Sequence, residues 1–159
     1  MAIAGVTTDY TGRKKDISIL QYPDATLVDA QTVSPKFGKN TRFCAGVQSL
    51  VQKYVVILLT NLESQEKYPD FGTNFMYTLQ AGISPTDRLL AAQIFNLASY
   101  KTVNTIKEYQ QEHADIPSDE RIVKATLTDI SLRGGSVGFD VTITTEAEDT
   151  IQFIIPLPK

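Results

Sequence analysis

Apolar residues in the last third of the chain alternate with polar ones, and this pattern constrains the fold most. Four of them occupy every second position, namely Val137, Phe139, Val141 and Ile143. A period of two is typical of a strand with one buried face. Similar segments lie at residues 123–127 and 151–155, and turn residues separate the three segments at 133–136 and 146–149. We therefore predict an α+β fold in which helices pack on one face of a three-stranded antiparallel meander.

Two irregularities are expected in this meander. Ile130 and Leu132 have the opposite parity to the apolar residues before them, Val123, Ala125 and Leu127. The first strand should therefore contain a bulge near Thr128 or Asp129, because one extra residue reverses the faces of a strand. The third strand should end at two residues that lack a backbone donor, Pro156 and Pro158.

Two helices are predicted before residue 82. From Thr41 onward, apolar residues recur at spacings of three and four, namely Val47, Leu50, Val51, Tyr54 and Leu58. This pattern predicts a helix that is capped by Asn40 or Thr41, buries Cys44 in its first turn and ends at Thr60. A short helix, capped by Thr73, should run to Leu79 and be followed by Gly82.

A third, longer helix is predicted to run from Ser84 and Pro85 to about Glu112, because a serine cap followed by proline is a strong start signal. Its main apolar stripe contains Leu90, Ile94, Leu97, either Tyr100 or Lys101, and then Val103 and Ile106. Three further residues lie off this line, Leu89, Phe95 and Tyr109. They indicate either a second, partly buried face or a surface for another chain.

Composition excludes several classes of protein. The chain has 159 residues and a formal net charge of −3, whereas nucleic-acid binders usually carry a basic excess. Its longest apolar run, at residues 55–59, is too short for a membrane span, and the N-terminal residues do not look like a secretory signal. Cys44 is the only cysteine, which fits a reducing compartment, and His113 is the only histidine. We expect no metal site and no cofactor.

The stretch at residues 55–72 joins an apolar run, a polar loop and a rigid return. Pro69 restricts the backbone, and Gly72 allows a tight turn that a side chain would hinder. Phe71 stands between these restricted positions, so we expect its ring to point inward as a core anchor.

Arg121 follows two acids, Asp119 and Glu120, at the start of the first strand. Its guanidinium suits bidentate pairing with a carboxylate. The carboxylate could be one of these neighbours or could lie on another subunit. We favour another subunit, because arginine is enriched at the cores of interfaces.

The first 40 residues lack helical periodicity, and glycine and proline interrupt them repeatedly. Short extended segments are expected at residues 17–20 and 25–28, but strands this short are not stable alone. We predict that residues 1–40 form an extended arm on the chain's own domain or on a neighbour, and that residues 41–159 form a single α+β domain. A disordered tail is the alternative.

The order of these features resembles the baseplate wedge proteins of contractile phage tails and the related component of the type VI secretion baseplate. In that family, an apolar helix ending in threonine precedes a short loop and then proline, an acid, phenylalanine and glycine. This chain has Leu58-Leu59-Thr60, a loop, and Pro69-Asp70-Phe71-Gly72. A Glu-Pro-Arg motif opens the meander of the family, and Asp119-Glu120-Arg121 stands in its place here. The resemblance covers roughly residues 40–156.

This resemblance implies a structural role in a virion, in the baseplate of a tail that assembles in the host cytoplasm. Members of the family bind other wedge subunits in a symmetric, multi-copy assembly and offer strands to the first sheath ring. Other wedge proteins and the sheath protein would be partners, with tube or hub proteins as further candidates, and neither nucleic acid nor membrane is expected. The interaction residues would be Pro69, Asp70, Phe71, Gly72, Asp119 and Arg121.

Two other functions are open at this point. The family also carries a lysozyme-like label, which implies a peptidoglycan-degrading tail enzyme. A glycosidase needs two carboxylates in contrasting environments, and Glu63 and Glu66 in a polar loop do not provide them. A free-standing adaptor or chaperone would need the same α+β core.

Overall fold

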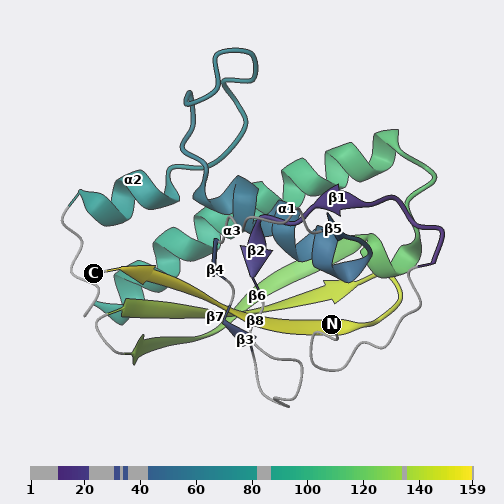
Figure 1. Ribbon diagram of the computed structural model, residues 1–159. Coiled ribbons are helices and arrows are strands. Elements are labelled where there is room, and N and C mark those ends of the chain that lie inside the picture. The colour runs from purple at the N-terminus through teal and green to yellow at the C-terminus, as the bar shows by residue number, and fades with distance from the viewer. Residues whose placement is uncertain are drawn as a thin grey trace.

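Figure 1 shows a computed structural model of the chain, which describes residues 11–21, 31–32, 34–35, 43–81, 87–133 and 136–158. Three helices lie on one face of a sheet: α1 (Val47–Leu59), α2 (Phe75–Gln80) and α3 (Arg88–Glu112). A 3-10 turn, η1 (Ser118–Glu120), leads from α3 into the antiparallel strands β6 (Ile122–Arg133), β7 (Ser136–Thr145) and β8 (Thr150–Pro158). The predicted α+β class is confirmed, and β6, β7 and β8 form the predicted antiparallel meander as part of a larger sheet.

The sheet gains a fourth strand from the N-terminal region. Its order is β3-β8-β7-β6, and β3 (Gln31–Thr32) pairs in parallel with Phe153 and Ile154 of β8. The sequence did not predict this pairing, because two residues are too few to show any periodicity.

Strand β6 contains two bulges. The register shift between Leu127 and Asp129 confirms the predicted bulge. A second shift between Ile122 and Lys124 makes Val123 the extra residue, so Ile122 is buried and Val123 is 41% exposed. The prediction that Val123 faces the core was wrong, because the bulge turns Val123 outward and Ile122 occupies the buried position.

Strand β8 continues through Pro156 and has Pro158 as its last residue, so only the predicted stop at Pro156 was wrong. Pro156 and Pro158 pair with Gly138 and Ser136 of β7. Among the described strands, β3 pairs with β8 only at Phe153 and Ile154. The prolines therefore lie where β8 has become an edge, and there one side needs no backbone donor.

Helix α1 begins at Val47 after Gly46, later than predicted. All five residues of its predicted apolar stripe are buried, and the helix ends at Thr60 as expected. Cys44 is buried, but it lies in strand β5 (Phe43–Cys44), which pairs with β1 (Asp16–Ile17), and not in the helix. Pairing with the N-terminal region keeps this segment extended.

Helix α3 begins at Arg88, and the side chain of Asp87 accepts a hydrogen bond from the backbone N–H of Leu90. The predicted start at Ser84 and Pro85, and Gly82 before it, lie outside the described residues. The helix ends at Glu112, as predicted.

The buried face of α3 agrees with the predicted stripe at Val103 and Ile106 but differs from it elsewhere. It consists mainly of small side chains around one large ring: Ala91, Phe95, Ala98, Ser99, Thr102, Val103, Ile106 and Gln110. Leu97 and Tyr100 of the predicted inner stripe are instead 75% and 70% exposed. Small residues let α3 approach its neighbours closely, and the Tyr54 hydroxyl of α1 lies 2.7 Å from Ser99 Oγ.

Phe75 of α2 is the central ring of the core. It is 1% exposed, and its ring lies 5.6 Å from that of Phe95 and 5.3 Å from that of Phe139, in edge-to-face contact with both. Thr73 directs the chain to this point, because its Oγ1 donates to the Leu58 carbonyl at 2.6 Å and accepts from the Phe75 N–H at 3.1 Å. The core thus joins α2, α3 and the sheet.

The described parts of the predicted arm lie on the chain's own domain. Strand β2 (Leu20–Gln21) pairs with β4 (Ser34–Pro35), and Leu20 is buried within the hydrophobic core. The extended segment predicted at residues 17–20 is divided between β1 and β2, and the one predicted at residues 25–28 lies outside the described residues. The domain boundary at residue 40 stays a prediction.

Candidate functional site

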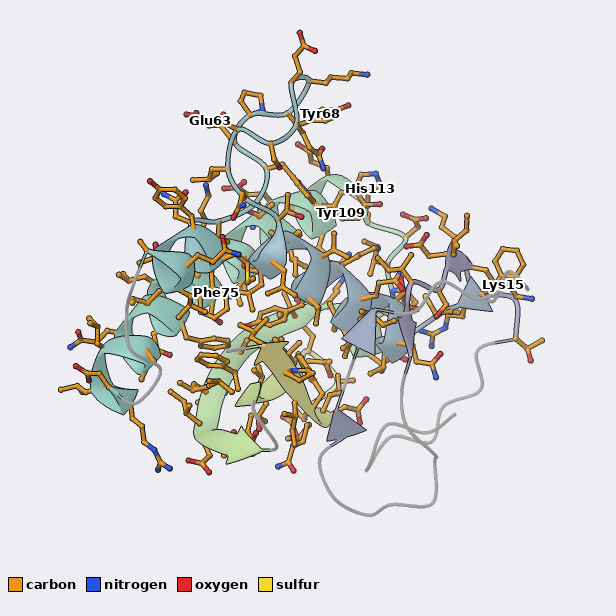
Figure 2. All side chains as sticks on the ribbon, turned by 60° about the vertical axis from the view of Figure 1, so that its left-hand side comes forward. Lys15, Glu63, Tyr68, Phe75, Tyr109 and His113 are labelled. Atoms are coloured by element: carbon orange, nitrogen blue, oxygen red, sulfur yellow. The ribbon has the colours of Figure 1, made fainter. Side chains whose placement is uncertain are left out.

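The loop between α1 and α2 projects away from the rest of the molecule (Figures 1 and 2). Its base is closed by backbone hydrogen bonds from Thr73 N–H to the Thr60 carbonyl at 2.8 Å and from Leu62 N–H to the Thr73 carbonyl at 3.1 Å. Gly72 lies within this closure at φ +104°, and a Cβ atom there would lie 2.3 Å from the Thr60 oxygen. Glycine is therefore required at the base of the loop.

The loop is also ordered by its own backbone. Glu63 N–H donates to the Pro69 carbonyl at 2.9 Å, Tyr68 N–H to Gln65 at 3.1 Å and Phe71 N–H to Tyr68 at 3.1 Å. Pro69 and Asp70 are exposed on it. These bonds fix the shape of the loop before any partner binds.

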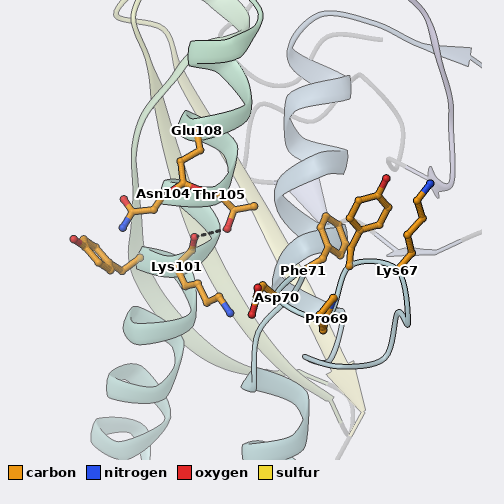
Figure 3. Close-up of a pocket in the computed structure, with 10 residues that line it drawn as sticks. Lys67, Pro69, Asp70, Phe71, Lys101, Asn104, Thr105 and Glu108 are labelled. Carbon is orange, nitrogen blue, oxygen red and sulfur yellow. Dashed lines mark hydrogen bonds between the residues drawn. The ribbon is translucent and has the colours of Figure 1, made fainter.

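A groove of about 650 Å³ separates the end of this loop from the middle of α3 (Figure 3). The loop contributes residues 67–71, and α3 contributes Tyr100, Lys101, Asn104, Thr105 and Glu108. Phe71 is only partly buried, since its ring both packs on the core and lines the groove. The prediction of Phe71 as the inward anchor is therefore corrected, because Phe75 holds that place.

Exposed apolar side chains lie along this part of α3. Tyr68 of the loop and Tyr100 of α3 line the groove and are 57% and 70% exposed, and Leu97 of α3 is 75% exposed. A second hollow of about 280 Å³ between α2 and α3 shares Lys101 with the groove and is lined by Leu97. The two hollows thus form one continuous surface along α3, which we call the α3 surface.

The acids considered for catalysis lie far out on the loop. Glu63 and Glu66 are both exposed, and Figure 2 shows Glu63 at the projecting end of the molecule. His113 instead stacks on Tyr109 with ring centroids 4.1 Å apart, and its Nδ1 lies 2.8 Å from the Tyr109 carbonyl oxygen. Neither Glu63 nor Glu66 is withdrawn from water, as the general acid of a glycosidase would need to be.

Asp119 and Glu120 bind a residue that the sequence did not single out. Arg13 Nη1 lies 2.8 Å from Asp119 Oδ1 and 2.7 Å from Glu120 Oε1. These hydrogen bonds, first with Asp119 and then with Glu120, raise the pKa of Arg13. The basic run at residues 13–15 and the acids at 115–120 are the only signal of this contact in the sequence.

Arg121 binds backbone carbonyl groups beyond the end of α3. Its Nε donates to the Ile116 carbonyl at 2.9 Å, and Nη2 lies 3.3 Å from that of Ala114 and 3.4 Å from that of His113. Glu146 Oε2 is 3.8 Å from Nε. Arg121 thus binds these carbonyl groups and not Asp119 or Glu120, the local partners considered from the sequence; the His113 carbonyl also accepts from the Ile116 N–H at 3.3 Å. Neither Asp119 nor Arg121 lines the groove, so the predicted interaction residues lie at two separate sites.

Replacement of Arg121 by alanine should lower the free energy of unfolding by about 1–3 kcal/mol, because the carbonyl groups would lose a charged donor. Glu146→Gln is the matched control and should cost little, since this pair is long and Glu146 is half exposed. Urea denaturation of both variants measures the difference. Equal midpoints for Arg121→Ala and the wild type would contradict this role.

Comparison of the chain with protein-family models, curated proteins and solved structures finds no significant match to any of them. Among the described residues, no group of three or more histidine, cysteine or acidic side chains is placed to hold a metal ion. In the same part of the chain, no helix has both the length and the apolar character to cross a membrane. The geometry of the α3 surface is therefore the main guide to function.

Proposed function

We propose that this chain is a structural component of the baseplate wedge of a contractile phage tail, or of a related injection machine. It would bind other wedge subunits and serve as a platform for the first sheath ring. One observation carries the proposal: Leu97 and Tyr100 of α3 face outward and are 75% and 70% exposed, although the buried face of the same helix includes several small residues. Large apolar side chains gathered on a surface typically mark a site for another protein.

The loop beside α3 makes this surface suitable for a specific partner. Its internal hydrogen bonds fix Tyr68 and Pro69 along one side of the groove, so little conformational freedom would be lost on binding. Tyrosine and other aromatic residues are enriched at the centres of protein interfaces. We infer that a neighbouring wedge subunit packs on the α3 surface.

The sheet offers a second contact of the kind that the resemblance to wedge proteins implies. Strand β6 (Ile122–Arg133) ends the sheet, and among the described strands it pairs only with β7. The unpaired backbone groups of an edge strand can accept a strand from another chain. In this proposal, that strand comes from a sheath subunit.

The proposal contains no catalytic step. Glu63 and Glu66 are exposed, and so are Asp70 and Glu108, the two carboxylates that line the groove, whereas a glycosidase needs one acid withdrawn from water. Hydrolysis of peptidoglycan by the purified protein, lost in a Glu63→Gln, Glu66→Gln double variant, would overturn the structural reading.

Incorporation into particles tests the function directly. A Leu97→Asp, Tyr100→Asp double variant should fold like the wild type, because exposed positions usually change stability by less than about 0.5 kcal/mol. The same variant should be missing from purified tails, since two charges would be buried in the interface. Quantitative mass spectrometry of the purified particles measures this loss.

The matched control is Gln111→Asp, which adds a charge at another exposed position of the same helix. It should be incorporated like the wild type. Wild-type incorporation of a correctly folded Leu97→Asp, Tyr100→Asp chain would remove the α3 surface from the proposal. Absence of the wild-type chain itself from purified tails would remove the proposal altogether.

A further inference from the structure

The N-terminal residues 13–20 lie across α1 as an extended segment and reach the turn η1 (Figure 1). Strand β1 pairs with β5 through only two residues on each side. At its far end Leu20 pairs with Pro35 of β4, and most other contacts of the segment are made by side chains of α1, of η1 and of the turn before η1. This arrangement has the features of a peptide bound to a receptor.

Gln52 of α1 recognises the backbone of this segment. It is 4% exposed, its Oε1 accepts from the Ile19 N–H at 2.8 Å, and its Nε2 donates to the Ile17 carbonyl at 2.8 Å. Both polar groups of one side-chain amide therefore bind alternate residues of an extended chain, as the backbone of a neighbouring strand would. Such recognition fixes the path of a peptide without regard to its sequence.

The two ends of the segment are bound by different kinds of contact, ion pairs at one end and apolar packing at the other. At one end, Arg13 binds Asp119 and Glu120, and Lys14 binds Asp115. At the other end, Leu20 is 6% exposed and belongs to the hydrophobic core. The site therefore selects an extended peptide with a basic beginning and an apolar end.

We propose that residues 13–20 occupy a peptide-binding site, and that this site also accepts the same segment from a second copy of the chain. Every contact described above forms equally well whether the segment belongs to the same chain or to its neighbour. Whether the site holds its own segment or that of a second copy then depends on the effective concentration of each segment and not on the energy of the contacts. An assembly that holds several copies side by side would favour exchange, and only this last step rests on the proposed function.

Cysteine cross-linking tests the exchange in solution. Ile17 and Phe43 are opposite each other in the β1–β5 pair, and both are exposed. Directly opposite residues of antiparallel strands lie within the range of a disulfide. In a Cys44→Ala background, one chain carries Ile17→Cys and another carries Phe43→Cys. When these chains are mixed at high concentration and oxidised, they should form a cross-linked heterodimer.

Two controls define the result. Tyr77→Cys, an exposed position on α2, replaces Phe43→Cys in a parallel mixture and gives the rate of random cross-linking. A single chain with both Ile17→Cys and Phe43→Cys should form an internal disulfide, which shows that the geometry allows the bond. We expect several-fold more heterodimer from the Ile17 and Phe43 mixture than from the Tyr77 mixture. Equal yields, with the internal disulfide formed, would overturn the exchange.

A peptide-binding measurement separates the site from the exchange. A fluorescent peptide of residues 11–21 should bind the full-length Arg13→Ala, Lys14→Ala variant, whose own segment is held more weakly, several-fold more tightly than it binds the wild type. The same peptide carrying both alanine substitutions should lose this binding. Failure of the unmodified peptide to bind a folded variant would overturn the peptide site. Neither experiment uses tail particles, so its outcome is independent of the incorporation test.

Discussion

Replacement of Gly72 by alanine should lower the free energy of unfolding by about 3–5 kcal/mol, a cost that is reached only where a backbone is strained or a core is disrupted. The new Cβ atom would lie 2.3 Å from the Thr60 carbonyl oxygen and 2.9 Å from its carbonyl carbon. Both atoms belong to the backbone, so neither can rotate away as a flexible side chain could. The hydrogen bond from Thr73 N–H to that oxygen would be strained as well.

Gly12→Ala provides a matched control for the conformational part of this cost. Gly12 also has a positive φ of +81°, but a Cβ atom there would meet nothing within 4 Å. The Gly12→Ala variant should therefore lose only about 1–2 kcal/mol of stability, which is the cost of placing alanine at a positive φ. Chemical denaturation of both variants measures the difference. Equal losses would show that the contact with Thr60 is relieved by a shift of the loop.

Phe75→Ala should lower the free energy of unfolding by about 3–5 kcal/mol, as expected for removal of a fully buried aromatic ring. The ring is 1% exposed and contacts the rings of Phe95 on α3 and Phe139 on β7. Its loss would leave a cavity between two helices and the sheet, since Phe95 and Phe139 stack on each other and cannot both move into the space.

Phe71→Ala is the control, because it removes the same side chain from a neighbouring, partly exposed position. Burial is smaller there, so we expect a loss of about 1–2 kcal/mol. Thermal and urea denaturation of the two variants should rank Phe75 well above Phe71. The reverse order would place the anchor of this region at Phe71, as the sequence alone had suggested.

Several elements could be predicted from the sequence because their signals are local. The period of two in residues 137–143 defined a strand with one buried face, and a change of parity placed the bulge beside Asp129. The stripe from Val47 to Leu58 defined the buried face of α1. Each of these features depends on the spacing of side chains within one element, which the backbone geometry converts directly into a face.

Which face of α3 is buried was decided by the tertiary structure, because the helix has apolar residues on more than one side. Hydrophobicity favoured Leu97 and Tyr100, whereas close packing against Tyr54 and the sheet required small residues such as Ser99. The number of apolar residues on a face does not predict this choice. Close packing depends on the distance between the two elements, whereas hydrophobicity describes only the transfer of a side chain to an apolar medium.

The contacts at the predicted interaction residues also came from the tertiary structure. Arg13 and Asp119 are 106 positions apart, and no local pattern links them. Arg121 has carbonyl groups as its partners because the chain that leaves α3 passes next to it and brings the Ala114 and Ile116 carbonyls to its guanidinium. The sequence could indicate that these charged side chains need partners, but only the folded chain decided which atoms are close enough to bind them.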